Sequence, residues 1–311
     1  MRLWFLVMRV IGLTSPKQLF EAEPAESRVF KDVSWLQPLS QPPGGKPLLR
    51  DEELRVLASY LTEALKKGKG RNVFIHGKPG TGKTLCVLYV LDEARKYAEE
   101  KGLEHFIVYV NAGRTRSPYY TMLELVRAMG VPVPESGWQM ARLKQVFEKT
   151  RGGKPMIIAV DEVDALLFKE REPLIYYLNR VPNITLILIS NRVTDVAALP
   201  DRALSTLQPR LFALEPYTVE EAKTILAERA ERAFQPGAVS EAQLDWIALV
   251  ASKLGDVRAG FRLLLAAGMY AERDGSPKVE STHLRNAFQT ETAIDQYKEG
   301  MEKLRRQKHP R

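Results

Sequence analysis

The spacing of apolar residues changes near residue 217. Before that point, apolar runs of four to seven residues alternate with stretches of helical spacing, such as 51–65 and 83–101. Nearly continuous apolar runs are typical of strands covered on both faces, and their alternation with helices is typical of a parallel sheet. The pattern therefore predicts an α/β domain with a five-stranded parallel sheet. Its strands are expected at residues 72–76, 106–111, 156–160, 184–190 and 211–214.

Only helical periodicity remains beyond Thr218. Thr218 with Glu221, and Ser240 with Gln243, have the spacing of capping boxes, in which a side chain satisfies a free backbone donor at a helix start. This part is expected to be a small all-α domain. Its helices are predicted at residues 219–234, 240–254, 257–271 and 281–304.

Proline and glycine mark the start of the α/β domain. Residues 37–47 contain four prolines and two glycines, which is typical of an extended linker. The predicted organisation is an N-terminal arm and linker (1–47), an α/β domain (48–216), a helical domain (217–290) and a basic C-terminal helix or tail (291–311).

The composition is that of a globular protein, with 45% hydrophobic and 27% charged residues among 311. The single cysteine, Cys86, excludes an internal disulfide and is interpreted as core packing. The first thirteen residues resemble a signal peptide, but Arg9 interrupts the apolar run, and Met8 is an alternative translation start. No other stretch approaches the roughly 20 apolar residues that span a bilayer, so we expect no membrane insertion and a cytoplasmic protein.

The net charge of +8 suggests a polyanionic partner, because each basic side chain placed on a phosphate releases counterions. A basic charge is also common in proteins that bind no nucleic acid. Charge alone therefore leaves both interpretations open.

One motif, GKPGTGKT, lies between a predicted strand and a predicted helix, which is the setting that the G-x-x-x-x-G-K-[ST] pattern requires. Its glycines let successive backbone N–H groups face phosphate oxygens, and the helix adds its positive N-terminal end. Lys83 is expected to reach the β- and γ-phosphates of ATP, and Thr84 to ligate Mg²⁺. The predicted contacts to ATP or ADP are Gly77, Lys78, Pro79, Gly80, Thr81, Gly82, Lys83, Thr84 and Leu85.

An acidic pair follows the predicted strand 156–160. Parallel sheets present ligand-binding groups at the carboxyl ends of their strands. Asp161 is expected to hold the Mg²⁺ shell with Thr84, and Glu162 to orient and deprotonate the attacking water. A helix cap is the simpler alternative for such a pair. Asp164 is interpreted only as an early-turn carboxylate favoured by the helix dipole.

Several segments, in their order and spacing, resemble the sequences of AAA+ ATPases. More narrowly, they resemble those of the archaeal replication initiators related to origin recognition complex subunit one and the cell-division-cycle loader. The resemblance covers about residues 28–290. It implies a P-loop NTPase domain followed by a helical lid domain. The segments are RNVFIHGKPGTGKT, YVNAGRTRSPYYTMLELV followed by VPVPESGW, VDEVDALL, LILISN, LPDRALSTLQPRLFALEPYTVEEAKTIL and GDVRAGFRLLLAAGMYAER.

The resemblance implies two residues that respond to the bound nucleotide. Asn191, which follows the fourth strand, resembles the sensor-one residue, whereas an asparagine at a strand end is otherwise a simple turn former. Arg258 resembles the sensor-two arginine of the lid, and its alternative is a solvated arginine. A cation at a helix N-terminus is mildly unfavourable, which favours the functional interpretation.

The resemblance also implies that Arg202 is supplied in trans to the ATP of a neighbouring subunit, with Arg210 as the alternative. Arginines supplied in this way raise rates by roughly 10³ to 10⁵ in other phosphate-transfer systems, so we expect slow hydrolysis by an isolated chain. Tyr217 and the arm around Phe30 are expected to border the adenine.

The family has a helical insertion that touches DNA in the region of residues 111–154. Basic side chains there would neutralise phosphates, and a solvated charged face is the alternative. Family members usually continue into a winged-helix domain, whereas here a basic tail follows the lid pattern, so the resemblance leaves sequence-specific recognition of DNA open. The basic residues of the insertion are Arg114, Arg116, Arg142, Lys144 and Arg151.

Three functions follow from these observations. The first is an ATP-controlled initiator of DNA replication that binds DNA through phosphates and associates with itself or with a related AAA+ subunit. The second is a nucleotide-dependent interaction or signalling module that does not bind DNA. The third is another DNA-handling AAA+ ATPase, either clamp-loader-like or linked to transposition.

Overall fold

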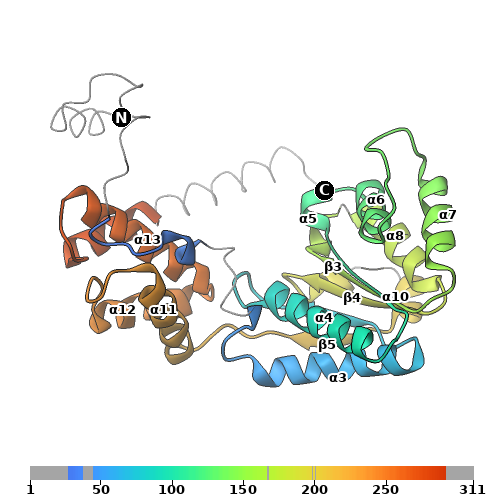
Figure 1. Cartoon of the computed structure of the whole chain (residues 1–311), viewed down its shortest axis with the longest axis horizontal. Coiled ribbons are helices and arrows are strands. Elements are labelled where there is room, and N and C mark those ends of the chain that lie inside the picture. The colour runs from blue at the N-terminus through green and yellow to red at the C-terminus, as the bar shows by residue number, and fades with distance from the viewer. Residues whose placement is uncertain (1–26, 38–44, 167, 198, 200, 292–311) are drawn as a thin grey trace.

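The computed structural model describes residues 27–37, 45–166, 168–197, 199 and 201–291. An α/β domain lies beside a smaller helical domain (Figure 1). Five parallel strands form one sheet in the order β2-β3-β4-β1-β5, which confirms the expected α/β fold. The strands are β1 (Val73–His76), β2 (Phe106–Asn111), β3 (Met156–Asp161), β4 (Ile184–Ser190) and β5 (Arg210–Ala213).

Different helices cover the two faces of the sheet, because successive strand residues point to opposite faces. Val73 and Ile75 of β1 pack into a core with α3 (Asp51–Lys67) and α4 (Lys83–Glu100). Phe74 points into the core on the opposite face. The helices that complete this second core are α6 (Pro118–Ala128), α7 (Met140–Arg151), α8 (Phe168–Arg180) and α10 (Asp201–Leu207).

The carboxyl ends of the strands meet at one edge of the sheet. Asn111 at the end of β2 is in register with Asp161 at the end of β3, and His76 of β1 is in register with Ser190 of β4. Because the strands are parallel, every segment that leaves this edge starts beside the others. The short helices that follow β2, β3 and β4 are α5 (Ala112–Thr115), η3 (Val163–Ala165) and α9 (Thr194–Ala197).

The helical domain contains both predicted capping boxes. The side chains of Thr218 and Ser240 each accept a hydrogen bond from the backbone N–H three residues later. The side chains of Glu221 and Gln243 accept one in turn from the backbone N–H of Thr218 and Ser240. Among the described residues, no helix combines the length and the hydropathy needed to cross a bilayer. The helices are α11 (Val219–Ala233), α12 (Glu241–Leu254), α13 (Val257–Arg273) and residues 281–291. The rest of the last helix, which was predicted to reach residue 304, lies outside the described residues.

The N-terminal arm packs into the helical domain. Val29 and Leu36 of residues 27–37 are fully buried in its core, and η1 (Val33–Leu36) packs beside α11. The Phe30 ring, which was expected to border the adenine, lies 4.9 Å from the Phe234 ring, centre to centre. From residue 27 on, the described chain thus begins in the helical domain, forms the sheet and returns to the helical domain after β5. The predicted domain boundaries stay predictions.

We expect Phe30→Ala to lower the free energy of unfolding of the helical domain by about 2 kcal/mol, because it removes a ring that packs on Phe234 and leaves a cavity. Leu254→Ala is the matched control, since Leu254 is 54% exposed and its loss should cost less than about 0.5 kcal/mol. Urea unfolding followed by circular dichroism measures both. Equal effects of the two substitutions would contradict the packing of the arm.

Candidate functional site

A glycine-rich loop joins β1 to α4 at the carboxyl edge of the sheet. Gly82 is the N-cap of α4 and adopts a left-handed backbone with φ +91°, and no side chain caps the helix start. Gly80 is also left-handed, with φ +80°. A helix start without a side-chain cap presents backbone N–H groups and the positive end of the helix dipole. The loop is therefore suited to bind an anion.

The Lys83 ammonium is buried where the loop meets β4. Its Nζ donates to the carbonyl oxygens of Gly77 (2.7 Å) and Lys78 (2.9 Å) and to Oδ1 of Asn191 (3.1 Å). All three acceptors are neutral, and burial lowers the pKa of Lys83 to about 8. A phosphate group fits this position, because its charge would stabilise the ammonium where neutral oxygens do not.

The Asp161 carboxylate is held by three donors. Its Oδ2 accepts from the Thr84 hydroxyl at 2.6 Å and from the Tyr109 hydroxyl at 2.8 Å, and its Oδ1 accepts from the backbone N–H of Glu162. Burial, followed by the nearby Asp161 charge, raises the pKa of Tyr109, so its hydroxyl stays a donor. A hydroxyl and a carboxylate side by side are the hard oxygen ligands that Mg²⁺ prefers, so this pair fits the ion.

Glu162 turns away from Asp161 through an unusual backbone conformation. Its φ of 50° and ψ of 43° lie in the left-handed region, which is rare for residues other than glycine, asparagine and aspartate. The carboxylate is exposed and accepts from Nδ2 of Asn111 at 3.2 Å. It also lies against Gly113, where a side chain would overlap it. Asn111 and α5 therefore hold the expected water-activating carboxylate.

Asn191 connects the loop to η3. Its Oδ1 accepts from Lys83, and its Nδ2 donates to Oδ2 of Asp164 at 3.3 Å. An ammonium on one side and a carboxylate on the other fix the orientation of the amide. The interpretation of Asp164 as only an early-turn carboxylate was too narrow, since it contacts the predicted sensor.

The start of α13 lies on the loop. Asp256 is the N-cap of α13 and sits so close to Gly80 that a side chain at position 80 would overlap it. The same carboxylate pairs with Arg258, whose Nε is 3.0 Å from Oδ1. The structure therefore brings Arg258 to the site, where its charge is one of the factors that lower the pKa of Lys83.

The remaining predicted site residues lie on α10, on β5, after β5 and on the loop and α4. Arg202 belongs to α10, and its side chain lies outside the described part of the chain. Arg210, on β5, lies over the Tyr60 ring at 4.8 Å. Tyr217 is buried, and its hydroxyl is 3.1 Å from where a β-carbon on Gly82 would lie, so it borders the loop. Lys78 and Pro79 are exposed on the loop, and Leu85 is half-buried in α4.

Sequence reasoning missed four residues that shape the site. Asn111 and Tyr109 are on β2. Asn111 could have been found from the sequence, because it is a polar residue at the end of a predicted parallel strand, where ligand-binding groups lie, and it is in register with Asp161. Arg50 is a cation at a helix N-terminus, which is locally unfavourable. Asp256 could have been found as an aspartate that directly precedes a predicted helix, which is the typical position of an N-cap residue.

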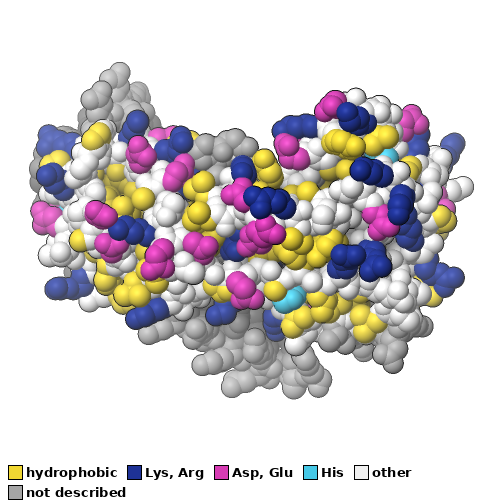
Figure 2. Space-filling model, turned by 90° about the horizontal axis from the view of Figure 1, so that it is seen from below, with side chains coloured by type: hydrophobic (Ala, Val, Ile, Leu, Met, Phe, Trp, Pro, Cys, Tyr) yellow, Lys and Arg dark blue, Asp and Glu magenta, His cyan; other side chains and the backbone are white. Residues whose placement is uncertain are grey.

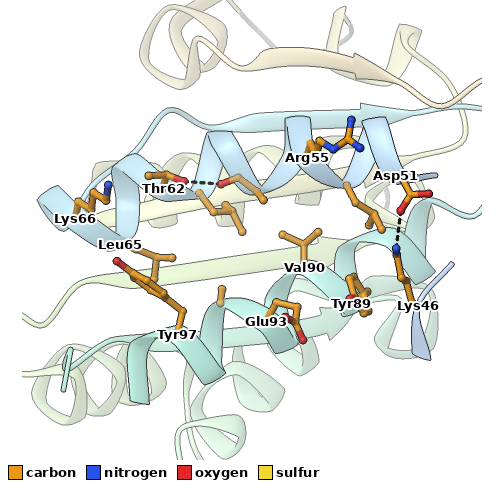
Figure 3. Close-up of a pocket in the computed structure, with 14 residues that line it drawn as sticks. Lys46, Asp51, Arg55, Thr62, Leu65, Lys66, Tyr89, Val90, Glu93 and Tyr97 are labelled. Atoms are coloured by element: carbon orange, nitrogen blue, oxygen red, sulfur yellow. Dashed lines mark hydrogen bonds and ion pairs between the residues drawn. The ribbon is translucent and has the colours of Figure 1, made fainter. Parts of the chain in front are cut away.

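A groove of about 570 Å³ lies between α3 and α4, outside this site (Figure 3). Its floor is apolar and includes Leu65 and Val90, and an ion pair between Lys46 and Asp51 lies at one end. None of the predicted nucleotide contacts is among the residues that line it. The chemistry at the edge of the sheet, rather than the size of this groove, identifies the candidate site.

Comparisons with known proteins agree with this geometry. Residues 73–210 match the ATPase family associated with various cellular activities (AAA), and residues 223–289 match the Cdc6 AAA+ ATPase-type lid domain. An ORC1-type DNA replication protein of Pyrococcus abyssi is 33% identical over 285 residues, which cover 87% of this chain and 67% of the relative. An ORC1-type DNA replication protein 1 of Sulfurisphaera tokodaii is 33% identical over 273 residues, covering 85% and 67%.

Two solved structures share the fold. The Aeropyrum pernix ORC1 protein in complex with DNA has a TM-score of 0.75 and 31% identity, and the alignment covers 85% of this chain and 70% of that one. The Aeropyrum pernix ORC2 protein, solved as ADPNP-ADP complexes, has a TM-score of 0.72 at 22% identity, covering 85% and 73%.

The low pKa of Lys83 predicts that binding of Mg-ADP takes up protons at pH 8. About half of the free sites lack the ammonium proton at that pH, and a bound phosphate raises the pKa, so binding takes up about half a proton. The affinity therefore falls as the pH rises above 8. Calorimetry in buffers of different ionisation enthalpy measures the uptake. At pH 6.5 it should vanish, and equal uptake at both pH values would contradict the assignment to Lys83.

Proposed function

Because this chain belongs to the AAA+ family of ORC1-type DNA replication proteins, we propose that it is an ATP-binding and slowly ATP-hydrolysing switch in the initiation of DNA replication. One observation carries the proposal. The buried Lys83 joins the anion-binding loop to Asn191, and the start of the lid helix α13 lies on that same loop. An anion bound to the loop would thus act on both the sheet and the lid.

The residues of the site support separate roles in this switch. Lys83 and the N–H groups of the loop would hold the phosphates, and Thr84 with Asp161 would hold Mg²⁺. When bound, Mg²⁺ supplies positive charge that stabilises the phosphate oxygens. Glu162 would orient a water molecule and accept its proton. Asn191 and Arg258 would distinguish ATP from ADP.

Two features support slow turnover by a single chain. Glu162 accepts a hydrogen bond from Asn111, which would hold its carboxylate in this orientation until a water molecule is bound beside it. Arg202 would act on the ATP of a neighbouring copy or a related AAA+ subunit. An arginine supplied by a second subunit is worth roughly 10³ to 10⁵ in rate in other phosphate-transfer systems.

Basic residues stacked on aromatic rings support DNA binding by the insertion. Arg142 lies 4.2 Å from the centre of the Trp138 ring, and Lys144 lies 4.2 Å from that of Tyr177. Such stacking holds cations at fixed positions, from which they can contact phosphates. Arg151 does not fit this role, because it is buried and donates to the Lys154 carbonyl.

Net charge alone does not locate such a surface. On the face shown in Figure 2, basic and acidic side chains are interspersed over both domains. The Aeropyrum pernix ORC1 protein was solved in complex with DNA, which supports a DNA partner for this chain. Contacts of Arg142 and Lys144 with phosphates would favour binding that depends on salt rather than on sequence.

Glu162→Gln should retain Mg-ATP binding and lower the hydrolysis rate by about 10² to 10⁴, because the amide cannot accept the proton of the water. Lys83→Ala should weaken binding itself. Glu104→Gln is the matched control, since Glu104 is exposed and pairs with Lys154. Equilibrium binding and phosphate release distinguish these effects. Hydrolysis by Glu162→Gln at the parent rate would exclude the proposed base.

Combined replacement of Arg142 and Lys144 by alanine should reduce the dependence of DNA affinity on salt. Each lost phosphate contact lowers the slope of log K against log salt by about 0.9. Lys96→Ala is the control, because Asp92 and Glu93 already pair with Lys96. Fluorescence anisotropy from 50 to 200 mM salt measures the slope. An unchanged slope would remove this part of α7 from the DNA interface.

A further inference from the structure

Arg50 is a buried cation that contacts both the loop and the entrance to the lid. It precedes α3, and only 4% of the residue is exposed. Its Nη2 donates to the carbonyl oxygens of Thr81 (3.0 Å) and Glu215 (2.6 Å). Its Nη1 pairs with Glu53 at 2.6 Å, and its guanidinium lies 4.0 Å from the centre of the Tyr217 ring. One planar group thus joins the start of α3, the loop and the segment after β5.

The segment after β5, residues 214–217, connects the sheet to the lid and lies along the loop, and we call it the hinge. The Leu214 carbonyl leaves no space for a side chain at Gly77. The Tyr217 hydroxyl approaches the position of a β-carbon on Gly82 to 3.1 Å. The hinge therefore contacts both ends of the loop directly, and Arg50 connects its middle to Thr81.

The chemistry of arginine makes this connection sensitive to movement. Two hydrogens of a single nitrogen satisfy two carbonyl groups, so displacement of either carbonyl stretches a bond to the other. Both bonds are charge-assisted, and such bonds are among the stronger ones in proteins; the bond to Thr81 is buried and the bond to Glu215 is partly buried. Burying a guanidinium costs free energy, and the Nε of Arg50 has no hydrogen-bond partner among the described residues.

We propose that Arg50 is a positioning residue that couples the nucleotide loop to the lid hinge. Phosphate binding would move the Thr81 carbonyl, Arg50 would transmit that movement to Glu215, and the lid would change its angle to the sheet. By thermodynamic linkage, the position of the lid would alter nucleotide affinity to the same extent. This inference rests on the proposed function as a nucleotide switch.

The test measures the lid angle as a distance between two labels on the full chain. Glu99→Cys in α4 and Ala242→Cys in α12 introduce exposed thiols on the two domains. The native Cys86 is buried, and burial raises its pKa to about 12, so it should not compete for the label. Pulsed electron spin resonance then gives the distance without nucleotide, with Mg-ADP and with a non-hydrolysable Mg-ATP analogue.

Arg50→Ala should weaken Mg-ADP binding about tenfold, because the coupling between two linked sites is typically worth roughly 5- to 150-fold in affinity. At saturating nucleotide, the shift in distance seen in the parent should be lost. Guanidinium ion added to this variant should restore part of the shift, which a general loss of stability would not allow. Arg55→Ala, an exposed arginine on the same helix, should behave as the parent.

Arg50→Lys covers the case in which the alanine variant does not fold. It keeps the charge but cannot reach both carbonyl groups with a planar fork, so it should bind nucleotide and lose most of the shift. A parent-like shift in the folded Arg50 variant, or no shift in the parent, would overturn the coupling. A parent that binds no nucleotide would instead overturn the proposed function, and the coupling with it.

Discussion

The buried ammonium of Lys83 is the interaction on which the arrangement of the site depends. It draws together two carbonyl groups of the loop that follows β1 and the amide of Asn191, which follows β4. Burial makes its charge costly, and only neutral oxygens accept its hydrogen bonds. The loop is consequently organised around a position that an anion stabilises. Asp161 and Glu162 are brought beside it because parallel strands end at a common edge.

The helical domain contacts the loop that would bind that anion. The N-cap of α13 contacts the loop at Gly80, and its Asp256 holds Arg258 by an ion pair. The hinge runs along the same loop. The arm of residues 27–37 is part of the helical core, so the chain connects the two domains before α3 and again after β5.

Periodicity and local motifs predicted much of this arrangement. The predicted strands and capping boxes are confirmed. They were predictable because each depends on residues that are close together in the sequence. The order of the strands was not predictable, since it depends on pairing between distant segments. For the same reason the contacts of Asn111 with Glu162 and of Arg50 with Glu215 escaped notice. The burial of Arg151 contradicts both its expected contact with phosphates and the alternative of a solvated face, because charge alone does not reveal which helix face is covered.

A decisive measurement is DNA binding by the full chain with ATP, with ADP and without nucleotide, at several salt concentrations, beside Lys83→Ala. We expect salt-sensitive binding whose affinity depends on the nucleotide, and loss of that dependence in the variant, because Lys83 would hold the phosphates in the loop on which the start of the lid helix α13 lies. About six phosphate contacts would weaken binding roughly 10³-fold between 50 and 200 mM salt. DNA binding of equal affinity in all three states, or none in any, would contradict the account.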